Sequence, residues 1–381
     1  MKIRSIELFK VPPRWLFLKM TTESGIVGWG EPVVEGKADS VAACVKELAA
    51  QLIGHSAGDI EDAFQMMYRG GFYRGGPIMT SAISGIEQAM WDIKGKYYNA
   101  PVYDLLGGKV RDRIQVYRWI GGDHPRDTAN AVKEAIAQGY RAVKMNGTDE
   151  LRWIDSYDKL DATVERVAAI REVDKNIGIA VDFHGRVHKT MAKVLMHKLE
   201  PYNLLFVEEP VLCENEDEFL ELSRTSHIPI ATGERNFTRW GFKRMLTRGG
   251  VDVIQPDVSH CGGILETRKI AAMAEAFDVA VAPHCPLGPI ALAACLQVDF
   301  CTPNAFLQEQ SAGIHYNEGY DLLNYLQNPQ VFQYQNGYCD LLKGPGLGVE
   351  IDEDYVRRMA AEGHDWHNPI WRDSDGAVAE W

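Results

Sequence analysis

Six ionisable residues recur at a regular spacing in the second half of the chain. They lie 23 to 27 residues apart, and they are Asp182, Glu208, Glu234, Asp257, His284 and Glu309. Each one ends a short apolar run, and the spacing is that of one strand-plus-helix unit. Because the carboxyl ends of the strands of a parallel barrel meet at one mouth, we expect the six side chains to converge there.

The carboxylates in this set predict a metal site. Burying several unpaired carboxylates together is strongly unfavourable, so a cation must neutralise them. Asp182, Glu208 and Glu234 follow three successive predicted strands and offer oxygen ligands from three directions. Hard oxygen ligands without cysteine favour Mg²⁺, which keeps open positions for water and substrate. The sequence therefore predicts a Mg²⁺ cofactor.

Two histidines fit acid–base chemistry beside that metal. His184 lies two residues after Asp182, and the two-residue period of a strand places both side chains on the same side. His284 ends the strand that follows Asp257, and a carboxylate on one ring nitrogen gives the orientation and basicity that a general base needs. A buried His–Asp pair that only stabilises the fold is the alternative for His284.

Other polar residues near the strand ends are expected to have supporting roles. Glu209 has the opposite parity from Glu208, so we expect it on the outer face in a structural ion pair. Three other histidines do not end a predicted strand: His188, His197 and His260. We expect them at the surface or behind the reacting groups.

The elements that must position these residues predict an α/β barrel. Eight apolar runs between Ile114 and Glu309 alternate with seven helix-length stretches, which is typical of a (β/α)₈ barrel. A doubly wound sheet is the alternative, but it would show fewer strands or a glycine-rich nucleotide turn. The predicted first strand runs from Ile114 to Ile120.

The flanking sequence predicts a second lobe. Residues 1–112 read as an α+β lobe of antiparallel strands and helices, residues 113–318 as the barrel, and residues 319–381 as a segment that packs back on the first lobe. A glycine-rich loop, Arg69–Pro77, holds two aromatic and two arginine residues. It is either a mobile connector or a loop that covers a pocket.

Composition excludes several classes of function. The 381 residues carry a net charge of −13 without a long basic run, so nucleic acid and anionic membranes are unfavourable partners. The amino terminus lacks a signal-peptide pattern, and the apolar stretch Ile290–Leu296 is too short to span a bilayer. The seven cysteines show no zinc or disulfide spacing. We expect a cytoplasmic protein with reduced thiols.

Local strings around the strand ends resemble those of the enolase superfamily, mandelate racemase subgroup. The resemblance covers essentially the whole chain, and its motifs are Asp182-x-His184, Val-Glu208-Glu-Pro, Gly-Glu234, Gln-Pro-Asp257 with a Gly-Gly pair, Ala-Pro-His284 and Gln-Glu309-Gln.

The resemblance implies a modified (β/α)₇β TIM-like barrel with an N-terminal α+β capping domain that the C-terminal segment completes. It also implies a Mg²⁺-dependent sugar-acid dehydratase, with D-galactonate as the leading substrate and a homo-oligomeric assembly. His284, oriented by Asp257, would abstract the C2 proton, and His184 would protonate the departing C3 hydroxyl. Glu309 would hydrogen-bond the substrate carboxylate, which requires a raised pKa.

The predicted substrate contacts are less tightly defined. They are Arg14, Tyr73, Lys144 and Asn146. Many relatives carry a Lys-x-Lys motif on the second strand, but this chain reads Lys144-Met-Asn146, which favours elimination over racemisation because asparagine cannot act as a base. Two alternatives stay open: dehydration of another hexonate or pentonate, and a non-catalytic barrel with a regulatory role.

Overall fold

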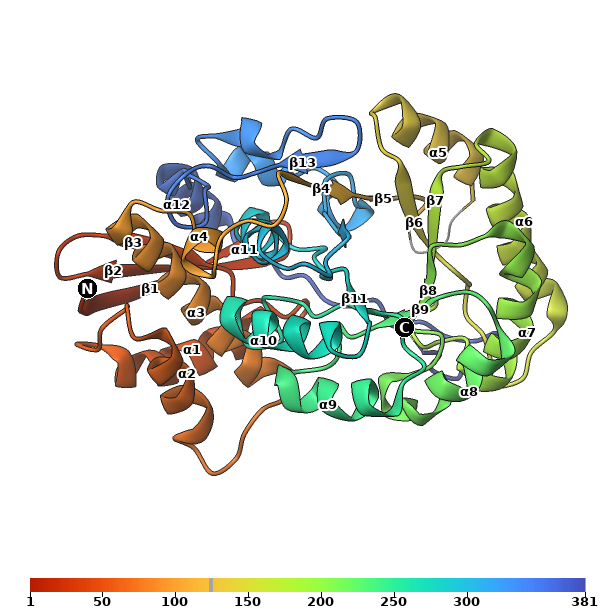
Figure 1. The fold of residues 1–381 in the computed structure, drawn as a ribbon, viewed down its shortest axis with the longest axis horizontal. Helices are drawn as coiled ribbons and strands as arrows, with labels where there is room; N and C mark the ends of the chain where they lie inside the picture. The colour runs from red at the N-terminus through yellow and green to blue at the C-terminus, as the bar shows by residue number, and fades with distance from the viewer. Residues whose placement is uncertain (123–125, 381) are drawn as a thin grey trace.

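The computed structural model describes residues 1–122 and 126–380. A lobe of sheet and helices, red to orange in Figure 1, lies beside a barrel coloured yellow to cyan, and blue C-terminal segments return to the first lobe. None of the helices in the described ranges combines the length and apolar character that crossing a membrane requires.

The first lobe begins with an antiparallel three-stranded meander, in which β2 pairs with both neighbours. Its strands are β1 (Ile3–Val11), β2 (Trp15–Thr22) and β3 (Val27–Gly30). Its helices are α1 (Ala38–Leu52), α2 (Ile60–Arg69), α3 (Pro77–Tyr98) and α4 (Val102–Leu105). Helix α3 starts at Pro77, whose fixed φ suits the first helical position.

The barrel strands run parallel in the order β5 to β11. They are β5 (Arg118–Trp119), β6 (Ala142–Asn146), β7 (Gly178–Asp182), β8 (Phe206–Glu208), β9 (Ile230–Thr232), β10 (Val253–Ile254) and β11 (Ala280–Val281). The helices between them are α5 (Thr128–Ala137), α6 (Tyr157–Val173), α7 (His188–Leu199), α8 (Asp217–Thr225), α9 (Thr238–Arg248), α10 (Ile264–Glu275) and α11 (Pro289–Phe300).

Two further strands close the barrel. A parallel bridge joins Val281 to Ala305, and β12 (Leu307–Gln308) then pairs with β4 (Arg113–Val116). The single strand predicted over 114–120 is wrong in one respect, because β4 and β5 separate at Tyr117 and pair with different neighbours. The predicted modified (β/α)₇β barrel with a capping domain is confirmed.

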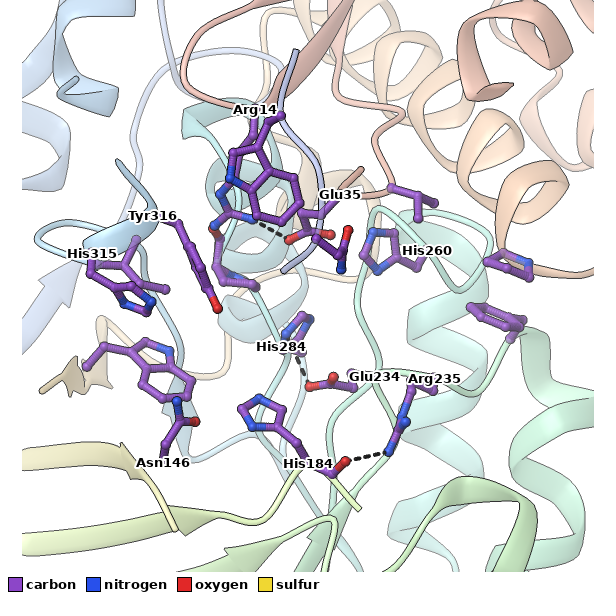
Figure 2. Close-up of a pocket in the computed structure, with 18 residues that line it drawn as sticks. Arg14, Glu35, Asn146, His184, Glu234, Arg235, His260, His284, His315 and Tyr316 are labelled. Carbon is purple, nitrogen blue, oxygen red and sulfur yellow. Dashed lines mark hydrogen bonds and ion pairs between the residues drawn. The ribbon is translucent and has the colours of Figure 1, made fainter. Parts of the chain in front are cut away.

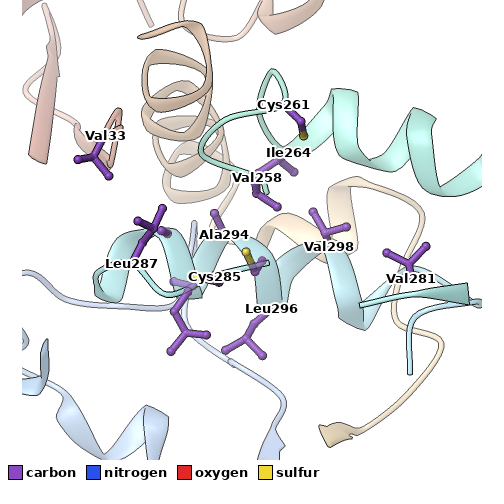
Figure 3. Packing of buried hydrophobic residues seen from close by; sticks show 14 of the residues in the cluster. Val33, Val258, Cys261, Ile264, Val281, Cys285, Leu287, Ala294, Leu296 and Val298 are labelled. Carbon is purple, nitrogen blue, oxygen red and sulfur yellow. The ribbon is translucent and has the colours of Figure 1, made fainter. Parts of the chain in front are cut away.

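Helix α11 forms the centre of the hydrophobic core. All of its residues are buried, including the apolar stretch that the sequence analysis singled out. Figure 3 shows Val258 from the barrel near Ala294 and Val298 of this helix, and α11 also contacts β3 and α4 of the first lobe. The helix therefore packs simultaneously against both parts of the molecule.

Two buried glutamates tie the capping domain to the barrel. The Glu31 carboxylate accepts hydrogen bonds from the backbone N–H groups of Gly288 (2.7 Å) and Ala291 (2.9 Å), at the start of α11. The Glu87 carboxylate on α3 accepts those of Ile264 (2.7 Å) and Leu265 (2.9 Å), at the start of α10. Both carboxylates satisfy helix N–H groups that lack intrahelical partners.

The C-terminal segment passes over both lobes. Strand β13 (Tyr338–Asp340) pairs with β4, and α12 (Glu353–Glu362) packs on β1. The His364 side chain then contacts the backbone oxygen of Trp15 at 3.2 Å, and the chain continues to the barrel mouth. Short 3₁₀ helices occupy Glu200–Tyr202, Cys213–Asn215, His315–Asn317, Leu322–Tyr325 and Pro329–Phe332.

Candidate active site

A cavity of about 300 Å³ opens at the carboxyl ends of the barrel strands. Figure 2 shows His184 and His284 in this cavity, with Glu234 between them. The capping domain supplies Arg14 and Glu35 to the wall, and other lining residues come from the C-terminal segment. The cavity is therefore built from three parts of the chain that are far apart in sequence.

The predicted metal ligands lie together below the cavity. One oxygen from each of Asp182, Glu208 and Glu234 lies within 4.8 Å of the others. Glu208 Oε1 is buried without a hydrogen-bond partner among the described residues, and the buried oxygens Asp182 Oδ2 and Glu234 Oε2 have only ion-pair contacts, with Lys144 and the two histidines. Hard oxygens held together in this way fit a cation such as Mg²⁺.

Electrostatics support the need for a cation at this point. Burial, reinforced by Asp182, raises the pKa of Glu208 well above its usual value. Lys144 on β6 is fully buried, and its Nζ atom contacts Glu208 Oε2 (2.7 Å), Glu309 Oε1 (2.9 Å) and Asp182 Oδ2 (3.3 Å). This ammonium offsets only part of the negative charge, so a bound metal ion would stabilise the remainder.

His284 is held by Asp257 on the barrel side of the cavity. Its Nδ1 atom lies 2.8 Å from Asp257 Oδ2, and its Nε2 atom lies 3.2 Å from Glu234 Oε2. Burial alone would lower the pKa of His284, but Glu234, Glu309 and Asp257 raise it well above its usual value. The imidazole is thus oriented with Nε2 toward the ligand cluster.

His184 lies on the other side of the ligand cluster, in a tight turn. Its Nε2 atom is 3.3 Å from Asp182 Oδ2, and its ring is parallel to that of Trp119 at a centroid distance of 6.2 Å. Arg186 contacts its Nδ1 atom at 3.2 Å. Burial and, to a lesser degree, Arg186 lower the pKa of His184 to about 4, although Asp182 opposes the shift. The ring is therefore neutral at pH 7.

Glu309 differs from its predicted protonation state. Burial alone would raise its pKa, but Lys144 and His284 lower the pKa instead. Its Oε1 atom accepts a hydrogen bond from Trp119 Nε1 (2.6 Å), and its Oε2 atom accepts one from the backbone N–H of Cys285 (2.8 Å). The predicted upward shift is wrong because the sequence analysis placed no buried lysine beside Glu309.

The predicted substrate contacts fall into three groups. Arg14 and Asn146 line the cavity, whereas Lys144 lies beneath it among the carboxylates. Tyr73 is 88% exposed on the loop between α2 and α3, outside the cavity wall. Its role in substrate binding stays a prediction, and the same holds for the other three residues.

The supporting residues lie closer to the site than predicted. Glu209 does form the predicted ion pair, with Arg235 Nη2 at 2.6 Å, but the outer-face position is wrong because the backbone turns at Glu209 (φ 41°). Arg235 lines the cavity and also donates to the backbone oxygen of His184.

His260 lines the cavity and contacts Asp257 Oδ2 at 3.4 Å. His188 is buried, and His197 is exposed.

Sequence reasoning missed a large part of the cavity wall. Glu35 had no predicted role, and it pairs at 2.7 Å with the predicted substrate contact Arg14 on the side of the cavity nearest the capping domain. Other lining residues without a sequence-based prediction are Trp119, Phe237, Ile314, His315, Tyr316, Trp366 and Asn368. The abundance of Trp and Asn in the C-terminal segment was the available signal, but it did not indicate the barrel mouth.

Comparisons with known proteins agree with this architecture. Residues 12–107 match the mandelate racemase / muconate lactonizing enzyme N-terminal domain, and residues 127–355 match the enolase C-terminal domain-like family. A solved structure of an enolase from Agrobacterium radiobacter, bound to sodium and L-malate, is similar over 100% of both chains with a TM-score of 0.89 and 30% identity. A member of the enolase superfamily from Salmonella Typhimurium covers 94% of this chain and 98% of its own, with a TM-score of 0.84 and 30% identity.

The fold and the carboxylate cluster at the barrel mouth define a member of the enolase superfamily, and the chain belongs to its mandelate racemase subgroup. Members of this superfamily use a divalent metal ion. The chain is 55% identical to D-galactonate dehydratases from Cronobacter sakazakii and from Ralstonia pickettii, over 100% of this chain and of each relative.

Proposed function

We propose that this protein is a Mg²⁺-dependent sugar-acid dehydratase that converts D-galactonate to 2-keto-3-deoxy-D-galactonate. The observation that carries the proposal is that His184 and His284 line one cavity (Figure 2) and contact different carboxylates of one cluster, Asp182 at 3.3 Å and Glu234 at 3.2 Å. Such an arrangement suits removal of a proton from one carbon and loss of a hydroxyl from the next. The full-length similarity to two D-galactonate dehydratases supports the substrate.

His284 acts as the base in this proposal. Asp257 accepts the hydrogen of Nδ1, and a metal ion held by Glu234 would offset the negative charge that raises the pKa of His284, so that Nε2 would then present its lone pair to the cavity. Nε2 takes the C2 proton, and the electron pair of the broken C–H bond moves into the substrate carboxylate. Asp182, Glu208 and Glu234 would hold Mg²⁺, and the bound ion would stabilise the negative charge that develops on that carboxylate.

His184 acts as the acid. As the C3–O bond breaks, its electron pair goes to the departing oxygen, which takes a proton from His184 Nε2 and leaves as water. The enol that remains tautomerises to the 2-keto acid. Lys144 forms ion pairs with Glu208 and Glu309 beneath the cavity, and Asn146 at the end of β6 provides no second base.

A substrate panel tests the proposal. The purified protein is freed of metal by dialysis against a chelator and incubated with hexonates and pentonates that differ at C2 and C3, with and without added Mg²⁺. We expect 2-keto-3-deoxy acid to form from D-galactonate only when Mg²⁺ is present. Turnover of another sugar acid alone would replace the substrate, and the absence of turnover on every acid would favour the non-catalytic alternative.

We further propose a cytoplasmic homo-oligomer, which size-exclusion chromatography with light scattering would test.

A further inference from the structure

We propose that Arg186, held in place by Trp371 of the C-terminal segment, is a positioning residue that fixes the tautomer of His184 and directs its Nε2–H into the cavity. The inference rests on the proposed role of His184 as the acid. Arg186 and Trp371 lie outside the metal ligands and outside the His284–Asp257 pair, and their side chains are 1% and 6% exposed.

The turn after β7 brings Arg186 back to the ring of His184. His184 and Gly185 both have positive φ angles, 48° and 71°, and the Arg186 N–H donates to the backbone oxygen of Phe183 at 2.9 Å. A Cβ atom at Gly185 would lie 2.8 Å from Arg235 Nη2, so a side chain there would disturb the turn. In this closed turn, Arg186 Nη2 reaches His184 Nδ1 at 3.2 Å.

The contact has a defined polarity. A guanidinium group has only donors, so His184 Nδ1 accepts the hydrogen bond. In the neutral ring the hydrogen then sits on Nε2, the nitrogen that faces Asp182 Oδ2 at 3.3 Å. The adjacent guanidinium also makes the Nε2 hydrogen more acidic, because it stabilises the electron density that the ring gains as this hydrogen is shared with the departing C3 oxygen. The opposite tautomer would present a lone pair to that oxygen and could not protonate it.

Trp371 holds the guanidinium in this orientation. The Cζ atom of Arg186 lies 4.0 Å from the centroid of the Trp371 ring, a cation–π geometry. Arg186 Nη1 also donates to the backbone oxygen of Thr148, on the loop after β6, at 3.2 Å. The guanidinium is therefore constrained by a ring face and a carbonyl while it contacts the histidine, and the C-terminal segment acts on the acid without touching the reacting atoms.

The decisive experiment compares dehydration with exchange of the C2 proton in D₂O, both with D-galactonate and saturating Mg²⁺. Arg186→Met removes the donor, Trp371→Leu removes the ring face, and Trp371→Phe restores an aromatic face. We expect Arg186→Met to lower dehydration by about tenfold or more while C2 exchange stays within about twofold of wild type. Trp371→Leu should act in the same direction but less strongly, and Trp371→Phe should recover most of the loss. The matched control is Trp240→Leu, because Trp240 also lies over an arginine (Arg239 Cζ, 4.4 Å) but does not line the cavity.

A second measurement does not depend on turnover. Nitrogen-15 NMR of the labelled histidines, with the His184 signals assigned by their loss in His184→Asn, reports which ring nitrogen carries the hydrogen. We expect the Nε2–H tautomer in wild type and a mixture in Arg186→Met, or in Trp371→Leu if Arg186→Met does not fold. An Nδ1–H tautomer in wild type, or an equal fall of dehydration and exchange in folded variants, would overturn the inference. If wild type does not dehydrate D-galactonate at all, the proposed function fails, and the tautomer still tests the Arg186 contact.

Discussion

The Nδ1 atom of His284 lies 2.8 Å from Oδ2 of Asp257, and the other oxygen of Asp257 accepts the backbone N–H of Ser259 at 2.7 Å. A carboxylate fixed at both oxygens cannot rotate away from the imidazole. Asp257 does not line the cavity, but it fixes the orientation of His284, which does. Replacing Asp257 should therefore change the rate of the step that His284 performs.

Replacing His284 with asparagine should abolish both dehydration and C2 proton exchange, because Asn146 offers no alternative base on β6. Asp257→Asn should lower both rates by about 10- to 100-fold, since the imidazole remains but loses its orientation and basicity. Proton NMR of D-galactonate in D₂O measures the exchange. If His284→Asn incorporated deuterium at C2 as fast as wild type, another group would be the base.

Replacing Glu208 with glutamine should weaken Mg²⁺ binding and abolish turnover without unfolding the protein, because one of three hard ligands becomes neutral. Isothermal titration calorimetry with Mg²⁺ measures the affinity, and circular dichroism measures folding. Glu221→Gln is the matched control, since Glu221 forms an exposed ion pair with Arg224. Unchanged Mg²⁺ affinity in Glu208→Gln would place the metal elsewhere.

His184→Asn should stop dehydration but leave C2 exchange with deuterium, because His284 on the other side of the cluster abstracts the proton. We expect a loss of at least about 100-fold in dehydration, in line with the contribution of a general acid. The measurement follows product formation and deuterium incorporation in the same sample. Loss of exchange as well, in a folded variant that binds Mg²⁺, would show that the two histidines do not have separate roles.

Glu87 should make the protein less stable as pH rises. Burial raises the pKa of Glu87 to about 7 in the folded protein, although hydrogen bonds from Leu265, Ile264 and Trp91 oppose the shift. Because the folded state then binds a proton more tightly than the unfolded state, stability is greatest below the unfolded pKa and falls up to pH 7. The expected fall is about 3 kcal/mol for this group.

The change that isolates this effect is Glu87→Gln, which cannot titrate. Urea unfolding at several pH values between 5 and 8 should show a flatter loss of stability in the variant than in wild type. Glu165→Gln, at an exposed position on α6, is the control and should leave the slope unchanged. An identical slope in Glu87→Gln and wild type would mean that Glu87 does not keep its raised pKa.

The sequence predicted the parts of the site that repeat with the fold. Strand-end residues such as Asp182, Glu208 and Glu234 lie one strand-plus-helix unit apart, so a parallel barrel brings them together whatever its loops do. Glu209 shows the limit of this rule, because a positive φ at that residue ends the strand alternation.

The rest of the site could not be predicted from local pattern. Glu35, Trp366 and Asn368 line the cavity from loops of irregular conformation. Such loops lack the two-residue period of a strand and the 3.6-residue period of a helix, so the sequence does not predict where their side chains point. The pKa of Glu309 depends on Lys144, which lies in the middle of a strand and is fully buried. Lysine is almost never fully buried unless it is paired. The sequence does not show the carboxylates that pair with Lys144, so we expected this lysine to contact the substrate instead.

The glutamate ties between the two lobes also restrict how the molecule can move. Rotating the capping domain away from the barrel would leave the carboxylates of Glu31 and Glu87, and the N–H groups at the starts of α10 and α11, without partners. Each of these hydrogen bonds contributes about 0.5–1.5 kcal/mol when water replaces the lost partner, so together they disfavour a hinge between the lobes. The two lobes are therefore held in one orientation by contacts in which the exposed loop at residues 70–76 takes no part.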